Sequence, residues 1–388
     1  MIYYFIIIFI ILYLIIISYI KITYNFWSKQ PVFHYYNFFY WIKPSGIINN
    51  DLPLTNNFCN FGNIKTNTYD KLSQLDKQFI VNFLKTNYLR SRYANYLPTE
   101  KSFNSYFENH VFDSYISIYT EDKLLLNYNN QSQINSKEII SIISGRPLYV
   151  SLNKVDFLVY YVDYLCVHPL YRKKNIAPQM IQTHEWYQRQ NNKKIKISLF
   201  KREGTLTGIV PLTVYNTYAY KKLSVYRFND PTMSIVLITK SNLYLLMDFV
   251  KNNIKKFDCT ITPHIGNLAN LIDNKIFYVY ILKSDINILA CYFFKNTFSI
   301  YHNKPLVELT SSISNCPYNE MFYNGFTNAY YYVCREIKTK IIIIENISHN
   351  VLIIKRIHKT PIEISPTAFF LYNYVSYSIK PDRIFCIY

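Results

Sequence analysis

Residues 161–178 combine residue types that could hold an anion. An apolar run ends at Val167, a turn with Arg172, Lys173 and Lys174 follows, and Pro178 lies where the first turn of a helix tolerates proline. A strand, a basic loop and a helix start in succession direct free backbone amides and three cations toward one phosphate-sized space. The pattern by itself also fits an ordinary β-to-α connection with a solvated, charged loop.

The chain around this segment is long enough to position such a site within a large core. Its 388 residues are long for one domain and suit two fused ones, although no internal repeat and no Gly/Ser-rich or Pro-rich linker marks a boundary. The seven cysteines are scattered without a Cys-x-x-Cys pair, so neither a zinc site nor a disulfide framework is indicated, and a reducing compartment is the simplest setting.

The N-terminal segment is typical of a membrane anchor. Residues Ile2 to Ile20 carry no charge, and about 20 apolar residues in a helix match the thickness of a bilayer core. A cleaved signal peptide would need a basic residue before the run and a small-x-small site after it, and neither is present. Lys21 and Lys29 follow the segment, so we expect a transmembrane helix with the rest of the chain facing the cytoplasm.

A formal net charge of +18 raises the question of nucleic-acid binding. No nucleic-acid motif accompanies this charge, and the lysines are spread along the chain. We therefore expect no nucleic-acid partner and interpret the charge as favouring ligand phosphates, anionic lipid or acidic substrates.

Three ordered segments resemble the N-myristoyltransferase family. Residues 164–168 read Tyr-Leu-Cys-Val-His and precede a basic loop ending in Ala177-Pro178, which is similar to that family's Asn-Phe-Leu-Cys-Val-His strand and Ala-Pro loop. Residues 24–32 resemble its Phe-Trp-x-x-Gln-Pro-Val segment, and residues 368–374 resemble its Gln-Tyr-Tyr-Leu-Tyr-Asn-Trp segment. The loop also fits the wider acetyltransferase pattern Arg-x-x-Gly-x-Ala with Asn175 at a glycine position, and Asn tolerates the left-handed conformation well.

The resemblance implies an α+β fold of two fused acetyltransferase-like (GNAT) halves related by pseudo-twofold symmetry, with mixed twisted sheets flanked by helices. Residues 1–20 would be the transmembrane anchor and 21–230 the half that binds acyl-CoA. Residues 231–388 would form the second half, with much of the peptide groove and a catalytic chain end.

The implied reaction transfers a myristoyl group from myristoyl-CoA to the amine of an N-terminal glycine, in a monomer without a metal or a tightly bound cofactor. The family's oxyanion hole consists of two backbone amides, which correspond to Tyr164 and Leu165 here. Its general base is the C-terminal carboxylate, which would belong to Tyr388. The other residues implied to contact the CoA donor are Tyr24, Asn25, Phe26, Trp27, Cys166, Val167, Arg172, Lys173, Lys174, Asn175, Ile176, Ala177 and Pro178. Cys166 and His168 are interpreted as structural.

The peptide side departs from the family. The acidic loop that reads basic residues of the substrate corresponds to residues 87–93, which include Arg90 and Arg92. We therefore expect acceptors that are acidic or neutral after the glycine. The family's Lys-Phe-Gly-x-Gly-Asp-Gly motif is replaced by residues 358–364, where Glu363 is a displaced acid, and Tyr215 stands where a substrate-lining His is usual.

Three alternatives to this function remain open at the level of sequence. The chain could use another acyl chain or acceptor, or it could be a catalytically retired relative that binds acyl-CoA or acylated peptides. Binding of nucleic acid is a more distant alternative.

Overall fold

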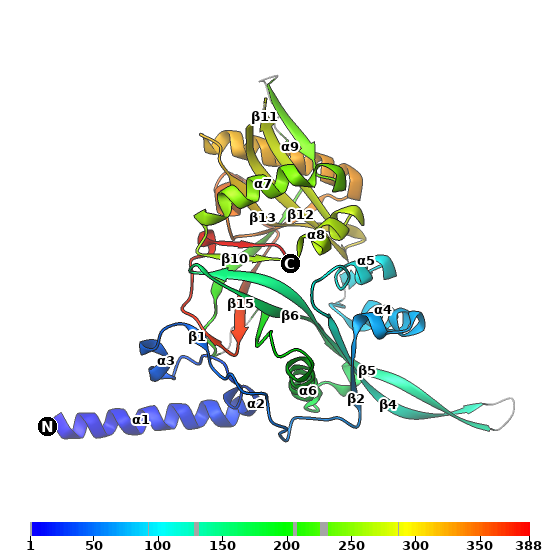
Figure 1. Ribbon diagram of the computed structural model, residues 1–388, viewed down its shortest axis with the longest axis vertical. Helices are drawn as coiled ribbons and strands as arrows, with labels where there is room; N and C mark the ends of the chain where they lie inside the picture. The colour runs from blue at the N-terminus through cyan, green and yellow to red at the C-terminus, as the bar shows by residue number, and fades with distance from the viewer. Residues whose placement is uncertain (1, 92, 128–131, 205–207, 226–231, 286) are drawn as a thin grey trace.

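The computed structural model describes residues 2–388 except 92, 128–131, 205–207, 226–231 and 286 (Figure 1). Fifteen of the described strands form one large mixed sheet, and β1 (Gly46–Ile47) and β16 (Tyr374–Val375) form a separate pair. The sheet runs through the whole molecule and helices pack against it, which confirms the predicted mixed sheet flanked by helices.

The first half of the sheet ends in a parallel pair of strands. Its order is β2 (Ile64–Thr68), β4 (Tyr115–Asn127), β5 (Ser132–Leu152), β6 (Val155–Val167) and β7 (Ile197–Glu203). Neighbouring strands are antiparallel except β6 and β7, which α6 (Ile176–Asn191) connects. Helices α4 (Gln74–Asn87) and α5 (Glu100–Ser105) lie between β2 and β4 in the chain.

The second half repeats this order. Its strands are β9 (Met233–Leu237), β11 (Phe277–Ser284), β12 (Asn287–Tyr301), β13 (Lys304–Ser314) and β14 (Ile341–Glu345). Again only the last pair is parallel, and α9 (Asn319–Ile337) connects β13 to β14. Helices α7 (Leu243–Asn253) and α8 (Ile265–Asp273) lie between β9 and β11, as α4 and α5 do in the first half.

The two halves exchange strands. β3 (Ala94–Tyr96) pairs with β12 of the second half, and β10 (Cys259–Thr262) pairs with β5 of the first. β8 (Thr213–Lys221) pairs with β14, and β15 (Glu363–Tyr372) pairs with β7, so the central order is β7-β15-β8-β14. The strand order on one side of β15 and β8 repeats in reverse on the other side, so a pseudo-twofold axis passes between these two strands. This symmetry agrees with the predicted fold. The division near residue 230 falls in residues 226–231, outside the described residues, and stays a prediction.

Both chain ends are placed by the remaining elements. β17 (Ile384–Cys386) lies parallel to β10 and brings Tyr388 into the middle of the molecule (Figure 1). At the other end, α1 (Ile2–Thr23) extends away from the body and has the length and composition to span a bilayer. The short helices are α2 (Asn25–Ser28), α3 (Phe38–Ile42) and α10 (Asn350–Ile354), with 3₁₀ turns at 69–71, 169–171, 240–242, 254–256 and 381–383.

Candidate active site

A bulge in strand β6 opens the centre of the first half. Between Ile142 and Ser144 of β5 the partner on β6 changes from Cys166 to Asp163, which leaves one extra residue on β6. Tyr164 lies in this bulge with φ 54°, a left-handed conformation that side chains rarely adopt. A bulge releases backbone groups from the ladder, and the Tyr164 N–H donates 2.7 Å to Oδ1 of Asp163 instead of to a neighbouring strand.

The basic loop after β6 has the predicted strand, loop and helix order. Helix α6 begins directly after Asn175, whose φ of 58° is left-handed, as expected for an Asn at a glycine position. Pro178 lies in the first turn, and Arg172, Lys173 and Lys174 are exposed to solvent. The Arg172 Nε donates 3.2 Å to the Val167 carbonyl, which holds the loop against the strand end. Exposed cations and a free helix start leave room for an anionic ligand.

A cavity of about 310 Å³ lies between the bulged strand and helix α6. Its walls come from β5, β6, β7 and α6, with Tyr88 after α4, Trp27 of α2 and Tyr372 of β15. The lining residues are Trp27, Tyr88, Ile143, Val162, Asp163, Tyr164, Leu165, Ile181, His184, Glu185, Ser198, Phe200, Lys201, Arg202 and Tyr372. The structure therefore brings three predicted residues together at one cavity, namely Trp27, Tyr164 and Leu165.

The other predicted residues lie around this cavity without lining it. Tyr24 and Asn25 are exposed, and Phe26 is buried against Phe58 with ring centroids 5.1 Å apart. Cys166 is buried behind the bulge, and burial raises the pKa of its thiol to about 11, which suits a structural thiol. Val167, the last residue of β6, is half-buried.

Of the two predicted acceptor-binding residues, Tyr215 is buried and Glu363 is exposed at the start of β15. Burial raises the pKa of Tyr215 well above its ordinary value, and the nearby Glu345 acts in the same direction. Tyr215 therefore belongs to the interior around Glu345, whereas Glu363 lies on the surface.

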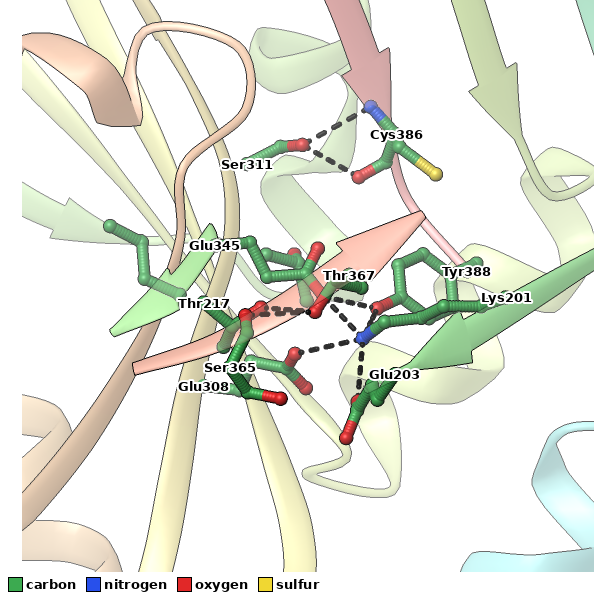
Figure 2. Close-up of polar contacts among 12 residues, drawn as sticks. Lys201, Glu203, Thr217, Glu308, Ser311, Glu345, Ser365, Thr367, Cys386 and Tyr388 are labelled. Atoms are coloured by element: carbon green, nitrogen blue, oxygen red, sulfur yellow. Dashed lines mark hydrogen bonds and ion pairs between the residues drawn. The ribbon is translucent and has the colours of Figure 1, made fainter. Parts of the chain in front are cut away.

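The chain end lies beside a cluster of buried charges (Figure 2). The Tyr388 hydroxyl donates 2.6 Å to Oε1 of Glu345, and Nζ of Lys201 lies 2.5 Å from the same oxygen and 2.7 Å from the Tyr388 hydroxyl. Lys201 also pairs with Glu308 at 3.7 Å and Glu203 at 3.4 Å. Tyr388 itself is buried. Because Lys201 also lines the cavity, this charge cluster connects the cavity to the end of the chain.

The two buried carboxyl groups of this cluster differ electrostatically. Burial raises the pKa of Glu345 to about 8, against the opposing effect of Lys201. Burial would also raise the pKa of Glu308, but Lys201 and Lys295 hold it below its ordinary value. The pKa of Lys201 is raised well above its ordinary value because Glu345 and its neighbours outweigh the cost of burial. Glu308 thus keeps its charge more readily than Glu345 does.

Two further cations, one buried and one half-buried, lie among the aromatic rings near the chain end. Lys295 Nζ lies 4.6 Å from the centre of the Tyr388 ring, and Arg146 lies 5.1 Å from the ring of Tyr161, which packs against Tyr388. Both cations also contact the Tyr106 ring. Within the described residues, neither terminal nitrogen of Arg146 has a hydrogen-bond partner. The side chain of the last residue therefore lies among both cations and carboxyl groups.

Sequence reasoning did not assign these charged residues a role. Lys295 and Glu308 interrupt apolar runs of their strands, and Lys201 and Glu345 each follow directly after one. Charged side chains are seldom fully buried unless they are paired. A charged residue within an apolar strand pattern could thus have indicated a buried charge. The pattern could not have indicated which residue of another strand pairs with it.

Glu185 of the cavity wall is expected to make stability depend on pH. Burial raises its pKa to about 7 from an ordinary value of 4.5, with Arg189 and Ser198 opposing. The folded state therefore holds the proton more tightly, and stability should fall as pH rises from about 4.5 to about 7. Glu185→Gln should remove this fall, a gain of about 3 kcal/mol at pH 8 relative to pH 4.

The measurement is urea unfolding of both proteins at several pH values. Glu320→Gln, a change at an exposed position in the first turn of α9, is the control and should leave the profile unchanged. Parallel profiles for wild type and Glu185→Gln would contradict the assignment.

Trp27 is expected to contribute to ligand binding. Its ring stacks on Phe200 at 5.6 Å, and both residues line the cavity. Trp27→Ala should weaken binding of an acyl-CoA by about 10- to 100-fold, because large aromatic side chains dominate such contacts. Calorimetric titration would measure this change. Trp186→Ala is the matched control, since Trp186 packs on Phe61 and does not line the cavity. Equal losses in both variants would contradict a direct role of Trp27.

The fold agrees with that of known proteins. The two strand-exchanged halves, the bulged strand and the basic helix start define a two-half α+β fold with one mixed sheet flanked by helices. Residues 45–212 match the family model of the myristoyl-CoA:protein N-myristoyltransferase N-terminal domain. Residues 45–212 therefore correspond to the N-terminal domain of that family, in agreement with the resemblance seen in the sequence.

Solved structures agree over nearly the whole chain. A crystal structure of the Saccharomyces cerevisiae N-myristoyltransferase with bound myristoyl-CoA has a TM-score of 0.69 at 13% identity, covering 92% of this chain and 94% of the yeast chain. A second yeast structure with bound myristoyl-CoA also has a TM-score of 0.69, at 14% identity, covering 93% of this chain and 91% of that one. A search of curated proteins finds no match.

Proposed function

We propose that this protein transfers a myristoyl group from myristoyl-CoA to the amine of an N-terminal glycine. The observation that carries the proposal is the bulge at Tyr164, which faces the cavity and lies within residues 45–212, the segment that matches the N-myristoyltransferase N-terminal domain. The similar yeast structures hold myristoyl-CoA, which supports the same donor here.

The donor would lie along β6 and the start of α6. Arg172, Lys173 and Lys174 and the first amides of α6 suit the CoA phosphates, because cations and a helix N-terminus both attract anions. Asn175, Ile176, Ala177 and Pro178 would form the rest of this cradle. The cavity between Trp27 and Leu165 would hold the thioester end of the donor, with Cys166 and Val167 behind it.

The amides of Tyr164 and Leu165 would stabilise the oxyanion formed when the amine attacks the thioester carbonyl. The new C–N bond forms, the C–S bond breaks, and CoA leaves as a thiol. One such donor contributes on the order of 3 kcal/mol to the transition state. The Tyr164 amide is bonded to Asp163 in this structure, so the thioester oxygen would have to replace this carboxylate.

The α-carboxylate of Tyr388 would take the proton from the glycine amine. Lys201 contacts the Tyr388 hydroxyl, Lys295 contacts its ring, and Arg146 packs on the neighbouring Tyr161 ring. These cations would favour the charged form of a carboxylate there, against the carboxyl groups of Glu345 and Glu308. The same cations disfavour an ammonium ion, which lowers the pKa of an amine from about 8 and makes its neutral, nucleophilic form easier to reach. The cations would thus lower both the pKa of the carboxyl base and the pKa of the ammonium group that it deprotonates.

The acceptor peptide would be acidic or neutral after its glycine. Lys201 and Arg202 line the cavity, and Arg90 is exposed just beyond α4, so a basic peptide would meet like charges. Arg92 of the same predicted basic loop lies outside the described residues. The buried Tyr215 remains a candidate contact for the acceptor, whereas the exposed Glu363 would act only if the peptide reaches the start of β15.

We also propose that the protein is a monomer anchored to a membrane through α1, with the catalytic body on the cytoplasmic side. The apolar composition of α1 supports attachment to a membrane, and the lysines that follow it suit the anionic surface of a cytoplasmic leaflet.

A second candidate is an acyl-CoA-binding protein without transferase activity. The bond between the Tyr164 amide and Asp163 favours it, because this carboxylate occupies one of the two oxyanion donors. The two candidates differ in turnover and not in ligand affinity.

The deciding experiment uses the full chain in detergent with a free C-terminus, alkyne-tagged myristoyl-CoA and glycine-initiated peptides that differ in charge after the glycine. N-acetylated peptides serve as controls because they lack the attacking amine. Label on acidic or neutral peptides supports the proposal, and label only on lysine-containing peptides overturns the acceptor preference. Binding of acyl-CoA without label on any peptide supports the binding protein. Peptides with a lysine amine and acyl-CoAs of other lengths test other substrates.

A further inference from the structure

Helices α1 and α3 expose most of their apolar side chains to solvent in the described chain. No residue of α1 is buried. In α3, Phe39 and Ile42 are 79% and 83% exposed, and Phe38 and Trp41 are also exposed. Apolar surface on this scale marks an interaction site.

The two helices are packed together. The Tyr13 hydroxyl donates 3.0 Å to the Tyr36 carbonyl, and its ring lies 5.3 Å from that of Phe38. Tyr13, Ile17 and Ile20 are the half-buried residues of α1, and their spacing places them on one helix face. The C-terminal half of α1 therefore lies against the body beside α3, and only its N-terminal half extends freely (Figure 1).

The free part of α1 is too short to cross a bilayer. Residues 2–12 are about 16 Å long at 1.5 Å per residue, whereas the hydrocarbon core is about 30 Å thick. A length of about 16 Å matches one leaflet. The whole helix could cross only if Tyr13 left its contacts with Tyr36 and Phe38.

The backbone around α3 is suited to a medium with little water. The Tyr377 hydroxyl lies 2.9 Å from the Trp41 carbonyl and 3.0 Å from the Lys43 carbonyl, and the Trp41 indole N–H donates to the Tyr35 carbonyl. Free carbonyls at the end of a helix are costly away from water, and the Tyr377 hydroxyl, which has one proton, donates to one of these two carbonyls at a time. The exposed Lys21, Lys29 and Lys43 lie near these helices in the chain and suit anionic headgroups.

We propose that residues 2–12 of α1 and the exposed face of α3, formed by Phe38, Phe39, Trp41 and Ile42, enter the same leaflet of an anionic bilayer. The protein is then monotopic, which replaces the predicted transmembrane crossing by a docked surface. Since Trp27 follows α1 closely and lines the cavity, the cavity lies near the headgroups. The inference depends on the packing of α1 and α3 and not on the proposed acyl transfer.

The first test measures the fluorescence of Trp41 in the full chain bound to phosphatidylcholine and phosphatidylserine vesicles that contain brominated lipids. The Trp41→Phe variant gives the contribution of the other two tryptophans. Bromine near the headgroups should quench wild type clearly more than Trp41→Phe. Equal quenching of the two proteins would overturn the docking of α3 in the bilayer. A second copy of the chain that covered α3 would give this result, because Trp41 would then not reach the lipid.

The second test separates docking in one leaflet from crossing. Phe39→Ser/Ile42→Ser in the full chain should be released from the same vesicles by alkaline carbonate, while wild type is retained. Tyr244→Ser/Tyr318→Ser replaces two exposed aromatic residues elsewhere and should be retained like wild type. If the α3 variant is also retained, α1 holds the chain by itself and the monotopic arrangement is wrong. Equal thermal midpoints would show that the exposed substitutions leave folding intact.

Discussion

Replacing the α-carboxylate of Tyr388 with a carboxamide is expected to reduce acyl transfer by about 10²- to 10⁴-fold, the usual contribution of a general base. The amide keeps the tyrosine ring, its bond to Glu345 and its contact with Lys295. It removes only the negative charge and the proton acceptor. Binding of myristoyl-CoA should change little, because the proposed donor site on β6 and α6 is separate from the chain end.

Cys386 makes this comparison possible by chemical ligation. A synthetic Cys386-Ile387-Tyr388 peptide, as the amide or the free acid, can be joined to residues 1–385 carrying a C-terminal thioester. The ligated free acid is the matched control for refolding, and single-turnover transfer to a labelled peptide is the measurement. Transfer at the same rate by both proteins would exclude the terminal carboxylate as the base. Asp163 would then be the next candidate, since its carboxylate lines the cavity beside Tyr164.

The sequence was informative where local rules apply. Pro178 and the basic residues before it predicted the strand, loop and helix succession, and the tolerance of Asn for the left-handed region explains Asn175 at the helix start. The bulge at Tyr164 was not predictable from the run of apolar residues, since a bulge depends on the register with β5. Only the family resemblance placed the two amides at this position.

Long-range pairing was beyond the sequence. β3 has three residues and β10 has four, so neither has a pattern that could show that each pairs with the other half. Glu345 follows four isoleucines and pairs with Lys201, 144 positions away in the chain. A buried charge in such a strand predicts that a partner exists, but finding that partner requires the sheet order β7-β15-β8-β14.

Lys201→Met is expected to destabilise the protein by about 3–5 kcal/mol, because removing one member of a buried ion pair leaves the other charge without compensation. Glu345 is fully buried, and the Lys201 side chain is 12% exposed. Burial already raises the pKa of Glu345, so without Lys201 the carboxyl should take up a proton. Its folded pKa lies above its unfolded one, so stability falls with rising pH, and the loss should be larger at pH 8.5 than at pH 5.5. Urea unfolding at both pH values measures it.

A double variant separates the ion pair from its function. Lys201→Met/Glu345→Met should recover most of the lost stability, since a well-packed apolar pair can replace a buried ion pair at little cost. The Tyr388 hydroxyl would then lack both partners, so transfer should stay low although the fold is restored. Lys275→Met is the surface control, because its pair with Glu336 is largely exposed and such pairs contribute about 0–1 kcal/mol. A double variant as unstable as Lys201→Met would show that Glu308 and Glu203, and not Glu345, are the partners that make Lys201 necessary.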